Sequence, residues 1–266
     1  DVPFAGLSIV LVADADNKAR AMELLDELST LAWDKRSEFI TEYEPYPATI
    51  AKAAQLDDGP ILLVDHGDNC ASGGSTDVMN VLREMISLGI RDVVAGPYCD
   101  PVAVETLIKA GKGSPCMIEL GGKADLSKVG FDNRPLLVSG TVANITDGTY
   151  TVTGPMFTGM RISLGRTAVL DTGDMLIVVC EKPQEPFDKG IFTHAGIHPE
   201  DKKYILLKSK QHFLAGFGRL AQHIIMVAGP GACGSDFFSF NYRNLKRPLF
   251  PFDECAHIED AEELIK

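Results

Sequence analysis

Short runs of branched aliphatic residues recur along the chain, and each of them stops at a polar or glycine-rich turn. Three of these runs lie at 61–64, 92–97 and 116–120, and the segments between them carry apolar residues at helical spacing. A nearly continuous apolar run is typical of a strand that is buried on both faces. Strands that alternate with helices through short connections predict a doubly wound, largely parallel sheet.

The pattern changes after Pro135. Apolar and polar residues then alternate in short segments that are separated by hairpin-type turns, which predicts an antiparallel β section in the form of a small subdomain or a lid. Alternation of strand and helix returns with a strand at 204–207, a helix at 211–220 and a strand at 224–228. The predicted fold class is therefore α/β, with a doubly wound, largely parallel sheet and an inserted antiparallel β section.

The amino-terminal part has a simpler pattern. A strand is predicted at 7–13, and a long amphipathic helix follows it from the turn residues at 14–17 to about residue 41. A short helix is expected at 49–55, ahead of the apolar run at 61–64. These first 59 residues are interpreted as packing elements rather than as a reactive site.

Polar residues gather in the loop that follows the run at 61–64. Between Asp65 and Asp77 the loop contains aspartates, a histidine, an asparagine, glycines and hydroxyl residues. Ser75 or Thr76 is expected to cap a helix that continues through Met85. Ligands of open α/β sheets bind outside the carboxyl ends of the strands, and the start of a helix offers free N–H groups to an anion. The loop is therefore the first candidate site.

A second polar corner follows the predicted strand at 204–207, where Lys208, Ser209 and His212 lie between a strand and a helix. These residues could bind an anion or a carboxylate. His212 could equally be a hydrogen-bonded structural histidine in the first turn of the helix. Both interpretations remain open from the sequence.

Charge and composition exclude several functions. The net charge is −12 and no basic run occurs, so a nucleic-acid partner is not expected. The longest apolar stretches are too short to span a bilayer, so no membrane partner is expected either. The six cysteines form no CxxC pair, which favours reduced thiols and a cytoplasmic location.

The familiar catalytic motifs are absent from the sequence. Asp65, His66 and Asp68 could ligate a divalent metal, but no HExxH or comparable ligand spacing accompanies them, so we predict no complete metal site in this chain. Carboxylates that position water or a ligand are the favoured interpretation. No Gly-x-Ser-x-Gly segment supports a serine hydrolase. A lone Gly-Gly-Lys at 121–123 is interpreted as a turn in preference to a phosphate site.

Several segments of the chain resemble the carboxyl-terminal domain of one family. They are, in order, DHGDNCASGGSTD, PYCDP, ELGGK, LGRTAVL, GIHPEDKKYILLKSKQHF and RPLFPFD. Together they resemble the microcystinase C-like (MlrC) family over about 60–253, and the amino-terminal segment resembles the end of that family's preceding domain. The resemblance implies a division of the chain into three parts. Residues 1–59 would be the tail of an amino-terminal, metal-binding domain, 60–254 the carboxyl-terminal α/β domain and 255–266 a tail.

The resemblance also implies a function, namely zinc-dependent hydrolysis of small linear peptides or related amides. The family's zinc ligands lie mostly in the amino-terminal domain, in motifs that this chain lacks. The residues of this chain that match the family's carboxyl-terminal motifs are therefore expected to line the cleft opposite the zinc. Those implied to be catalytic are Asp65, Asp68, Asn69 and His212, and those implied to bind substrate are Ser72, Gly73, Gly74, Lys208 and Ser209.

The loop departs from the family at one point, since the family usually has Asn-Pro-Gly-Gly-Gly where this chain has NCASG at 69–73. The leading hypothesis is the carboxyl-terminal part of a zinc peptidase or amidohydrolase, inactive without the missing amino-terminal domain. Its expected partners are a peptide or amide substrate, that domain and a second copy in a homo-oligomer. The alternatives are a non-catalytic α/β module that binds a small anionic ligand and, more weakly, a structural or oligomerisation part.

Overall fold

The computed structural model describes residues 1–254, which divide into two compact units. The larger unit is Tyr43–Ser235, and the smaller one combines Asp1–Glu42 with the segment that starts at Asp236. The expected tail at 255–266 lies outside the described residues, as do Cys255 and His257. None of the helices within residues 1–254 is long and apolar enough to cross a membrane.

Eight strands of the larger unit form one sheet in the order β10-β1-β9-β2-β8-β7-β4-β3. The strands from β10 to β8 in this order are mutually parallel, whereas β7, β4 and β3 add antiparallel pairs at the other end. The predicted α/β class with a large, mostly parallel sheet is therefore confirmed. The bounds are β1 Ile61–Asp65, β2 Val93–Cys99, β3 Pro115–Leu120, β4 Leu136–Thr146, β7 Thr167–Asp171, β8 Met175–Cys180, β9 Tyr204–Leu207 and β10 His223–Val227.

The antiparallel section differs from the expectation in two respects. β3, expected as a third parallel strand, pairs antiparallel with β4 at the edge of the sheet. The two places beside β2 in the sheet are occupied by β8 and β9, which come from later in the chain. β4, β7 and β8 extend the main sheet and form no separate subdomain, and β5 (Thr149–Thr151) and β6 (Arg161–Ser163) alone make a second, two-stranded sheet.

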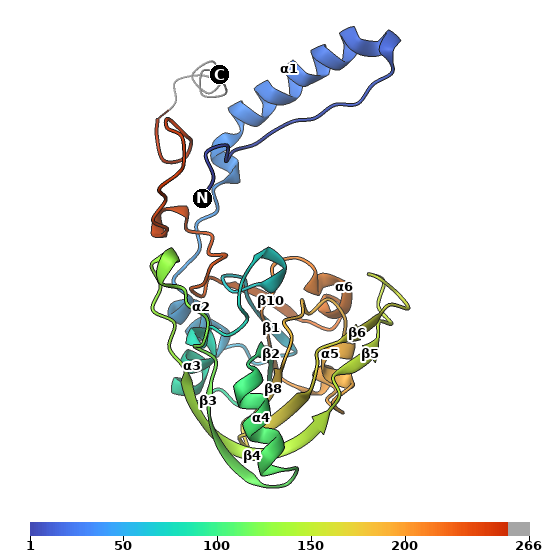
Figure 1. Cartoon of the computed structure of the whole chain (residues 1–266), viewed down its shortest axis with the longest axis vertical. Coiled ribbons are helices and arrows are strands. Elements are labelled where there is room, and N and C mark those ends of the chain that lie inside the picture. The colour runs from blue at the N-terminus through green and yellow to red at the C-terminus, as the bar shows by residue number, and fades with distance from the viewer. Residues whose placement is uncertain (255–266) are drawn as a thin grey trace. The chain divides into compact units, whose positions relative to one another are not determined.

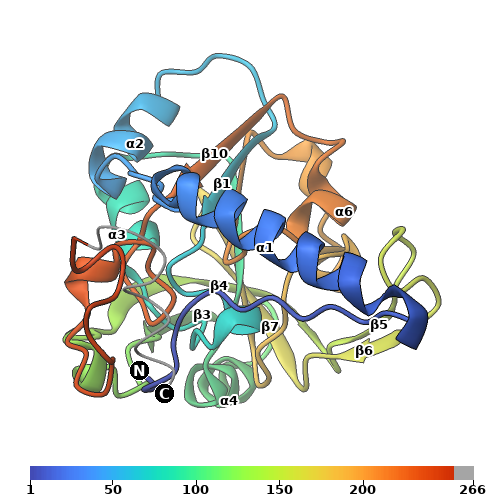
Figure 2. The ribbon, with the colours of Figure 1, turned by 90° about the horizontal axis from the view of Figure 1, so that it is seen from above.

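Hydrophobic clusters cover both faces of the sheet. Side chains of β1 alternate between them, with Leu63 in one cluster and Leu62 and Val64 in the other, which is why the apolar run is continuous. One cluster packs under α2 (Tyr46–Ala53), α3 (Asn80–Ser87) and α4 (Pro101–Ala110). The other packs under α5 (Gly190–Thr193), α6 (Phe213–Phe217) and the β5–β6 hairpin, on the opposite side in Figures 1 and 2.

The smaller unit contains one long helix, α1 (Lys18–Asp34), with short 3₁₀ turns at Ala15–Asn17, Arg36–Phe39 and Phe237–Ser239. The two sequence segments of this unit meet where the Asp1 carboxylate accepts hydrogen bonds from the N–H groups of Arg243 and Asn244, at 2.8 and 2.9 Å. Figure 1 shows α1 as a continuous helix. None of its residues is buried.

The strand predicted at 7–13 does not form, so that prediction is wrong for the described structure. Val10 and Val12 are 84% and 96% exposed, and the segment is irregular. A strand needs a partner strand to satisfy its backbone groups. No strand lies within the described residues of the smaller unit, so the alternating pattern of 7–13 has nothing there to pair with.

Candidate functional site

Three loops carry most of the buried polar residues of the larger unit, and each follows the carboxyl end of a strand in the parallel part of the sheet. The first follows β1 and extends from Asp65 to Asp77, the second follows β8 and contains Glu185, and the third follows β9 and begins at Lys208. β1 and β9 are direct neighbours, so the first and third loops meet. Open α/β sheets bind their ligands at this edge.

Lys208 forms a buried cluster with two carboxylates of the first loop. Its Nζ lies 2.9 Å from Oδ2 of Asp65 and 3.1 Å from Oδ2 of Asp68. It also donates to the carbonyl of Val78 at 2.7 Å and lies 5.6 Å from the centre of the Tyr98 ring. Two of the three N–H donors of this lysine are thus used in hydrogen bonds, and its charge is also paired with the Asp68 carboxylate. Lys208, which is 3% exposed, is therefore committed to the protein itself.

Burial and charge oppose each other in this cluster. Burial favours the neutral form of Lys208, but the Asp65 and Asp68 carboxylates outweigh it and raise the pKa of Lys208. Burial also raises the pKa of Asp65, because desolvation outweighs the attraction of Lys208. Two carboxylates and one ammonium leave a net charge of about −1.

Asp68 organises its own loop. Its Oδ1 accepts the N–H groups of Ser75 and Thr76, at 2.7 and 3.0 Å, and the Ser75 hydroxyl at 3.0 Å. Its Oδ2 accepts the N–H of Val78 at 2.9 Å. A carboxylate with this many donors is held in place. The fully buried Asp68 side chain therefore shapes the path of the chain between β1 and α3.

These bonds also explain why the expected helix cap at Ser75 or Thr76 is wrong. α3 starts at Asn80, and Met79 at its N-cap makes no side-chain capping bond. The Ser75 hydroxyl instead donates to Asp77 at 2.6 Å, and Thr76 has a left-handed backbone with φ of 56°. A residue with that φ cannot continue a right-handed helix. Asp100, in contrast, caps α4, since its side chain accepts the Ala103 N–H at 3.0 Å.

Two buried groups at the end of β1 lack partners among the described residues. They are Oδ1 of Asp65 and both ring nitrogens of His66. The His66 ring is 1% exposed and packs against Tyr43, with 4.5 Å between ring centroids. Burial, helped by the charge of Lys210, lowers the pKa of His66 to about 4. The imidazole is therefore neutral at pH 7.

A glycine-rich segment packs closely on this strand end. A side chain at Gly67 would overlap the carbonyl of Gly229, and one at Gly231 would overlap the carbonyl of Gly67. A side chain at Gly229 would reach Oδ1 of Asp65. The Gly-Pro-Gly segment after β10 thus packs against the first loop through direct backbone contacts. Only glycine, which has no Cβ, permits an approach this close. This segment was not singled out from the sequence.

The tip of the first loop is a tight turn that starts at Asn69. The Asn69 side chain accepts the Ala71 N–H at 3.0 Å and donates to the Ser72 hydroxyl at 3.3 Å. Gly73 has φ of 96° and open space beside its Cα, whereas a side chain at Gly74 would overlap the backbone of Asp68. The structure thus brings the loop's predicted residues into one turn, with Ser72 and Gly73 exposed at its tip.

Glu185 joins the second and third loops, and sequence reasoning missed it. Its Oε1 accepts a hydrogen bond from the Ser209 hydroxyl and lies 3.9 Å from Nδ1 of His212. Burial raises the pKa of Glu185, although Ser209, His212 and the nearby Ala71 N–H and Asn69 side chain favour its charged form. The available signal was a glutamate between two prolines in PQEPFD, directly after an apolar run. His212 itself is half exposed.

The Gly-Gly-Lys segment forms a turn, in line with its interpretation from the sequence. Gly121 and Gly122 have φ of 64° and 68°. The Lys123 ammonium lies 2.7 Å from Oδ2 of Asp100 and also donates to the carbonyl of Glu119. Its charge is therefore neutralised within the protein, and the segment does not present a free lysine to a phosphate.

The residues described do not fit a zinc ion. Within 1–254, no three side chains of His, Cys, Asp or Glu converge on a position that could hold a metal. Asp65 and Asp68 each direct an oxygen at Lys208, whose ammonium occupies the place that a cation would need. Zinc chemistry therefore has no ligand set in the part of the chain that the structure describes.

The described cysteines are not paired with one another. The five cysteines within residues 1–254, at positions 70, 99, 116, 180 and 233, form no disulfide. Burial raises the pKa of Cys70 to about 12 and that of Cys99 to about 11. Since the thiolate is the nucleophile, neither residue is activated at neutral pH.

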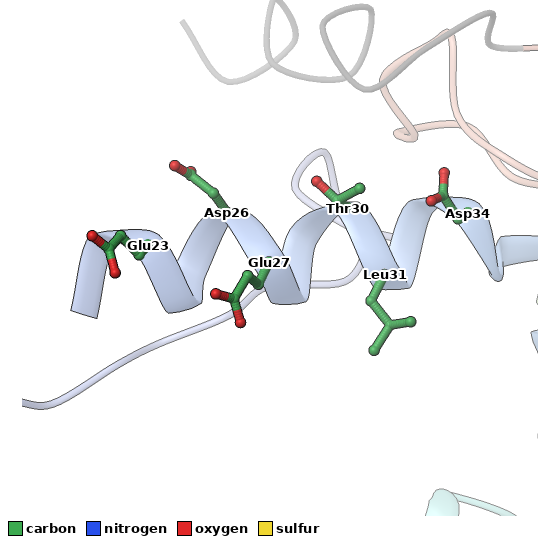
Figure 3. Close-up of a pocket in the computed structure, with 6 residues that line it drawn as sticks. All are labelled: Glu23, Asp26, Glu27, Thr30, Leu31 and Asp34. Atoms are coloured by element: carbon green, nitrogen blue, oxygen red, sulfur yellow. The ribbon is translucent and has the colours of Figure 1, made fainter. Parts of the chain in front are cut away.

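The smaller unit has a shallow depression along α1, shown in Figure 3. Its lining comes from one helix, and the side chains project in different directions from the helix instead of converging (Figure 3). Acidic side chains without a converging partner are typical of a solvated helix face. The lining residues are Glu23, Asp26, Glu27, Thr30, Leu31 and Asp34.

Known proteins are similar to this chain in sequence and in fold. Residues 63–244 match the family model described as MlrC C-terminus. Over 205 residues the chain is 30% identical to Microcystinase C from Sphingomonas sp., a match that takes in 77% of this chain and 38% of that protein. A crystal structure from Mesorhizobium sp. BNC1, of a protein described as a candidate metallopeptidase, aligns with a TM-score of 0.77 at 23% identity, over 88% of this chain and 46% of that chain.

These similarities differ in what they establish. The structural neighbour, at its low identity, supports the fold alone. The chain spans less than half the length of Microcystinase C, so the activity of that whole protein does not transfer with the match. The family model, in contrast, covers the sheet, the three loops and most of the larger unit. The chain belongs to the MlrC family and carries its carboxyl-terminal domain.

Proposed function

We propose that this chain is the carboxyl-terminal part of a peptidase or amidohydrolase that acts on small linear peptides or related amides. The observation that carries the proposal is the buried Lys208–Asp65–Asp68 cluster at the carboxyl edge of the sheet, within the segment that matches the MlrC family. Such a cluster holds two loops in fixed positions, which is what a substrate-binding wall requires.

The metal is proposed to lie elsewhere. Because the residues described here do not fit zinc, we assign its ligands to the part of the longer relatives that this chain does not span. In this division, residues 1–59 end a preceding metal-binding domain and 60–254 form the opposite wall of the cleft. The chain by itself is then inactive.

The site residues divide into two roles in this proposal. Asp65, Asp68 and Lys208 form the buried frame, and the four bonds that Asp68 accepts favour an orienting role over that of a base. The exposed groups contact the substrate. They are Ser72 and Gly73 on one side and His212 on the other, with Gly74 and the buried Asn69 and Ser209 directly behind them. His212, which is half exposed, is the residue placed to exchange a proton with a bound substrate.

The alternative, a non-catalytic module that binds a small anion, has less support. The Lys208 ammonium, on which that hypothesis depended, is neutralised by two carboxylates. The cluster keeps a net negative charge, which repels an anion. A homo-oligomer and a cytoplasmic location remain predictions.

The test compares this chain with the full-length gene product. Each is supplied with zinc and assayed against a panel of small linear peptides and amides. We expect turnover by the full-length protein alone. Robust turnover by residues 1–266 would contradict the placement of the metal, and a full-length protein that binds zinc but hydrolyses nothing in the panel would contradict the peptidase itself.

A matched pair of variants in the full-length protein links activity to this wall. Ser72→Ala removes a hydroxyl from the exposed turn and should lower kcat/KM, while Ser114→Ala removes a hydroxyl between α4 and β3 and should not. Equal activities for the two variants would remove the turn from the substrate site.

A further inference from the structure

The carboxylate of Glu185 has one oxygen that the protein leaves unused. Glu185 is 6% exposed, and its Oε2 has no hydrogen-bond partner among the described residues. Its Oε1 is bonded to the Ser209 hydroxyl. A buried carboxylate oxygen without a hydrogen-bond donor is costly, because it has lost its hydrogen bonds to water. A donor from outside the chain would remove that cost.

The nearby Ala71 N–H and Asn69 side chain favour the charged form of Glu185, but neither makes a hydrogen bond to Oε2, and the other donors nearby have acceptors of their own. The Asn69 amide donates to Ser72, and the Lys208 ammonium is surrounded by its own three acceptors. Lys210 is exposed, and its ammonium donates to the Ser235 hydroxyl. Nδ1 of His212 lies 3.9 Å from Oε1, which is beyond hydrogen-bonding distance. The carboxylate is therefore not neutralised by a close partner.

The charge of the surroundings selects the sign of the ligand. The Lys208 cluster has a net charge of about −1, and an ionised Glu185 adds another. A corner with this negative charge does not favour the anion that the sequence suggested as a ligand of Lys208, Ser209 and His212. It favours a cation that carries N–H donors, since no group of three metal-ligating side chains converges within the described residues. An ammonium group meets both conditions.

The corner also borders the surface. Ala71 and Ser72 of the first loop are exposed, as are Gln211 and His212 of the third. The His212 side chain is 49% exposed and can change rotamer without disturbing the core. Its movement would give a small group access to Glu185 from the side on which the turn at Asn69 lies.

We propose that Glu185 binds the positively charged terminal amine of a peptide substrate, in the corner formed with Asn69, Ser209 and His212. The assignment rests on the proposed peptidase function and makes it more specific. It places the amino end of the substrate at this corner, so that peptides with a free amino terminus are preferred over blocked ones. An ammonium supplies the donor that Oε2 lacks and forms a charge-assisted hydrogen bond with it.

The first experiment measures binding to this chain and needs no hydrolysis. L-Alaninamide, which carries an ammonium, is titrated against N-acetyl-L-alaninamide, which does not, and against acetate, with amide shifts followed by NMR. Alaninamide should bind with a dissociation constant near the millimolar level, about tenfold or more tighter than the acetylated compound. Shifts should include residues 69–72 and 209–212.

Variants then separate charge from shape. Glu185→Gln should abolish the preference for alaninamide, and Glu185→Asp, which keeps the charge, should retain part of it. Glu119→Gln is the matched control, because it removes the same charge from an exposed position on β3. A preference that survives Glu185→Gln, or acetate that binds more tightly than alaninamide, would overturn the proposal. The spectra of all variants report whether each remains folded.

The second experiment uses the full-length protein and one peptide, with its amino terminus free or acetylated. Glu185→Gln should lower kcat/KM for the free peptide by about ten- to a hundredfold and leave the acetylated one nearly unchanged. Hydrolysis without any preference for the free amine would overturn the Glu185 assignment while the peptidase function stands. Amine binding without hydrolysis of any peptide would do the reverse.

Discussion

Lys208 and Asp65 lie 143 residues apart in the sequence, yet their side chains meet at 2.9 Å beneath the carboxyl edge of the sheet. Both are almost completely buried, and Asp68 shares the same ammonium at 3.1 Å. The pair therefore connects two loops that the sequence presents as separate polar corners.

Removal of the lysine should leave two buried carboxylates without a counter-ion. Lys208→Met keeps the length of the side chain and should lower the free energy of unfolding by about 3–5 kcal/mol. Urea denaturation of the chain measures the change. Lys189→Met is the control, because it breaks the partly exposed pair with Glu200 and should cost about 1 kcal/mol or less. Similar losses in the two variants would contradict a special role for the buried cluster.

Asp68→Ala should loosen the first loop before it affects the rest of the domain. The change frees the N–H groups of Ser75, Thr76 and Val78, and we expect a stability loss of about 2 kcal/mol or more. Hydrogen exchange should accelerate at these amides while the amides of β1 stay protected.

Asp125→Ala serves as the comparison for this variant, since the exposed Asp125 carboxylate accepts the Ser127 N–H in a surface turn. It should leave the exchange of the first loop unchanged. If Asp68→Ala left those amides equally protected, the four bonds to Asp68 would not be what holds the loop.

His66 should make stability depend on pH in the acidic range. Its pKa falls from 6.5 to about 4 on folding, mainly through burial, so the unfolded chain binds the extra proton between these values. The contribution of neutral His66 to the free energy of unfolding is fully present above pH 6.5. It is lost as the pH falls toward 4, by about 3 kcal/mol. His66→Phe should flatten the pH dependence of the unfolding free energy in this window. An unchanged slope would mean that His66 titrates alike in both states.

The close approach of glycine backbones should make Gly67 less replaceable than Gly73. A methyl group at Gly67 would overlap the Gly229 carbonyl, which cannot move without displacing the loop after β10. At Gly73 the added methyl group meets open space, and the cost is the positive φ alone, about 1 kcal/mol. Thermal unfolding should therefore show a larger decrease in Tm for Gly67→Ala than for Gly73→Ala. The opposite order would contradict the observed packing of the two loops.

Much of the fold followed from the sequence because the apolar runs are unambiguous. The strand at 204–207 coincides with β9, and those at 61–64 and 92–97 correspond to β1 and β2. α4 begins with a local signal of the same kind, since Asp100 caps the helix and Pro101 fits its first turn. Local signals of this type do not depend on the rest of the chain.

Strand direction and strand order were not readable in the same way. β3 has the composition of a buried strand but lies antiparallel at an edge, because β8 and β9 occupy the positions beside β2. The segment at 7–13 has the alternation of a strand and lacks a partner in its unit. In each case the outcome depends on residues far away in the sequence, which a local pattern cannot contain.

The site shows the same division. The sequence singled out Asp65, Asp68 and Lys208 as polar residues at strand ends, and the structure brings these three together. The sequence could not reveal that the two carboxylates neutralise the Lys208 ammonium, because that depends on distances between loops that follow two different strands. Glu185 was missed because a single glutamate in a proline-rich loop has no spacing pattern, and its importance comes from its burial beside Ser209.

The position of β1 between β9 and β10 has a consequence for the synthesis of this protein. β1 is made before both of its partner strands, so its backbone groups and the carboxylate of Asp65 stay unpaired while the long segment between β1 and β9 is synthesised. The nascent protein therefore carries an open, aggregation-prone strand until residues beyond Val227 have been added. A chain that is truncated before that point would depend on chaperones and be a ready target for proteolysis.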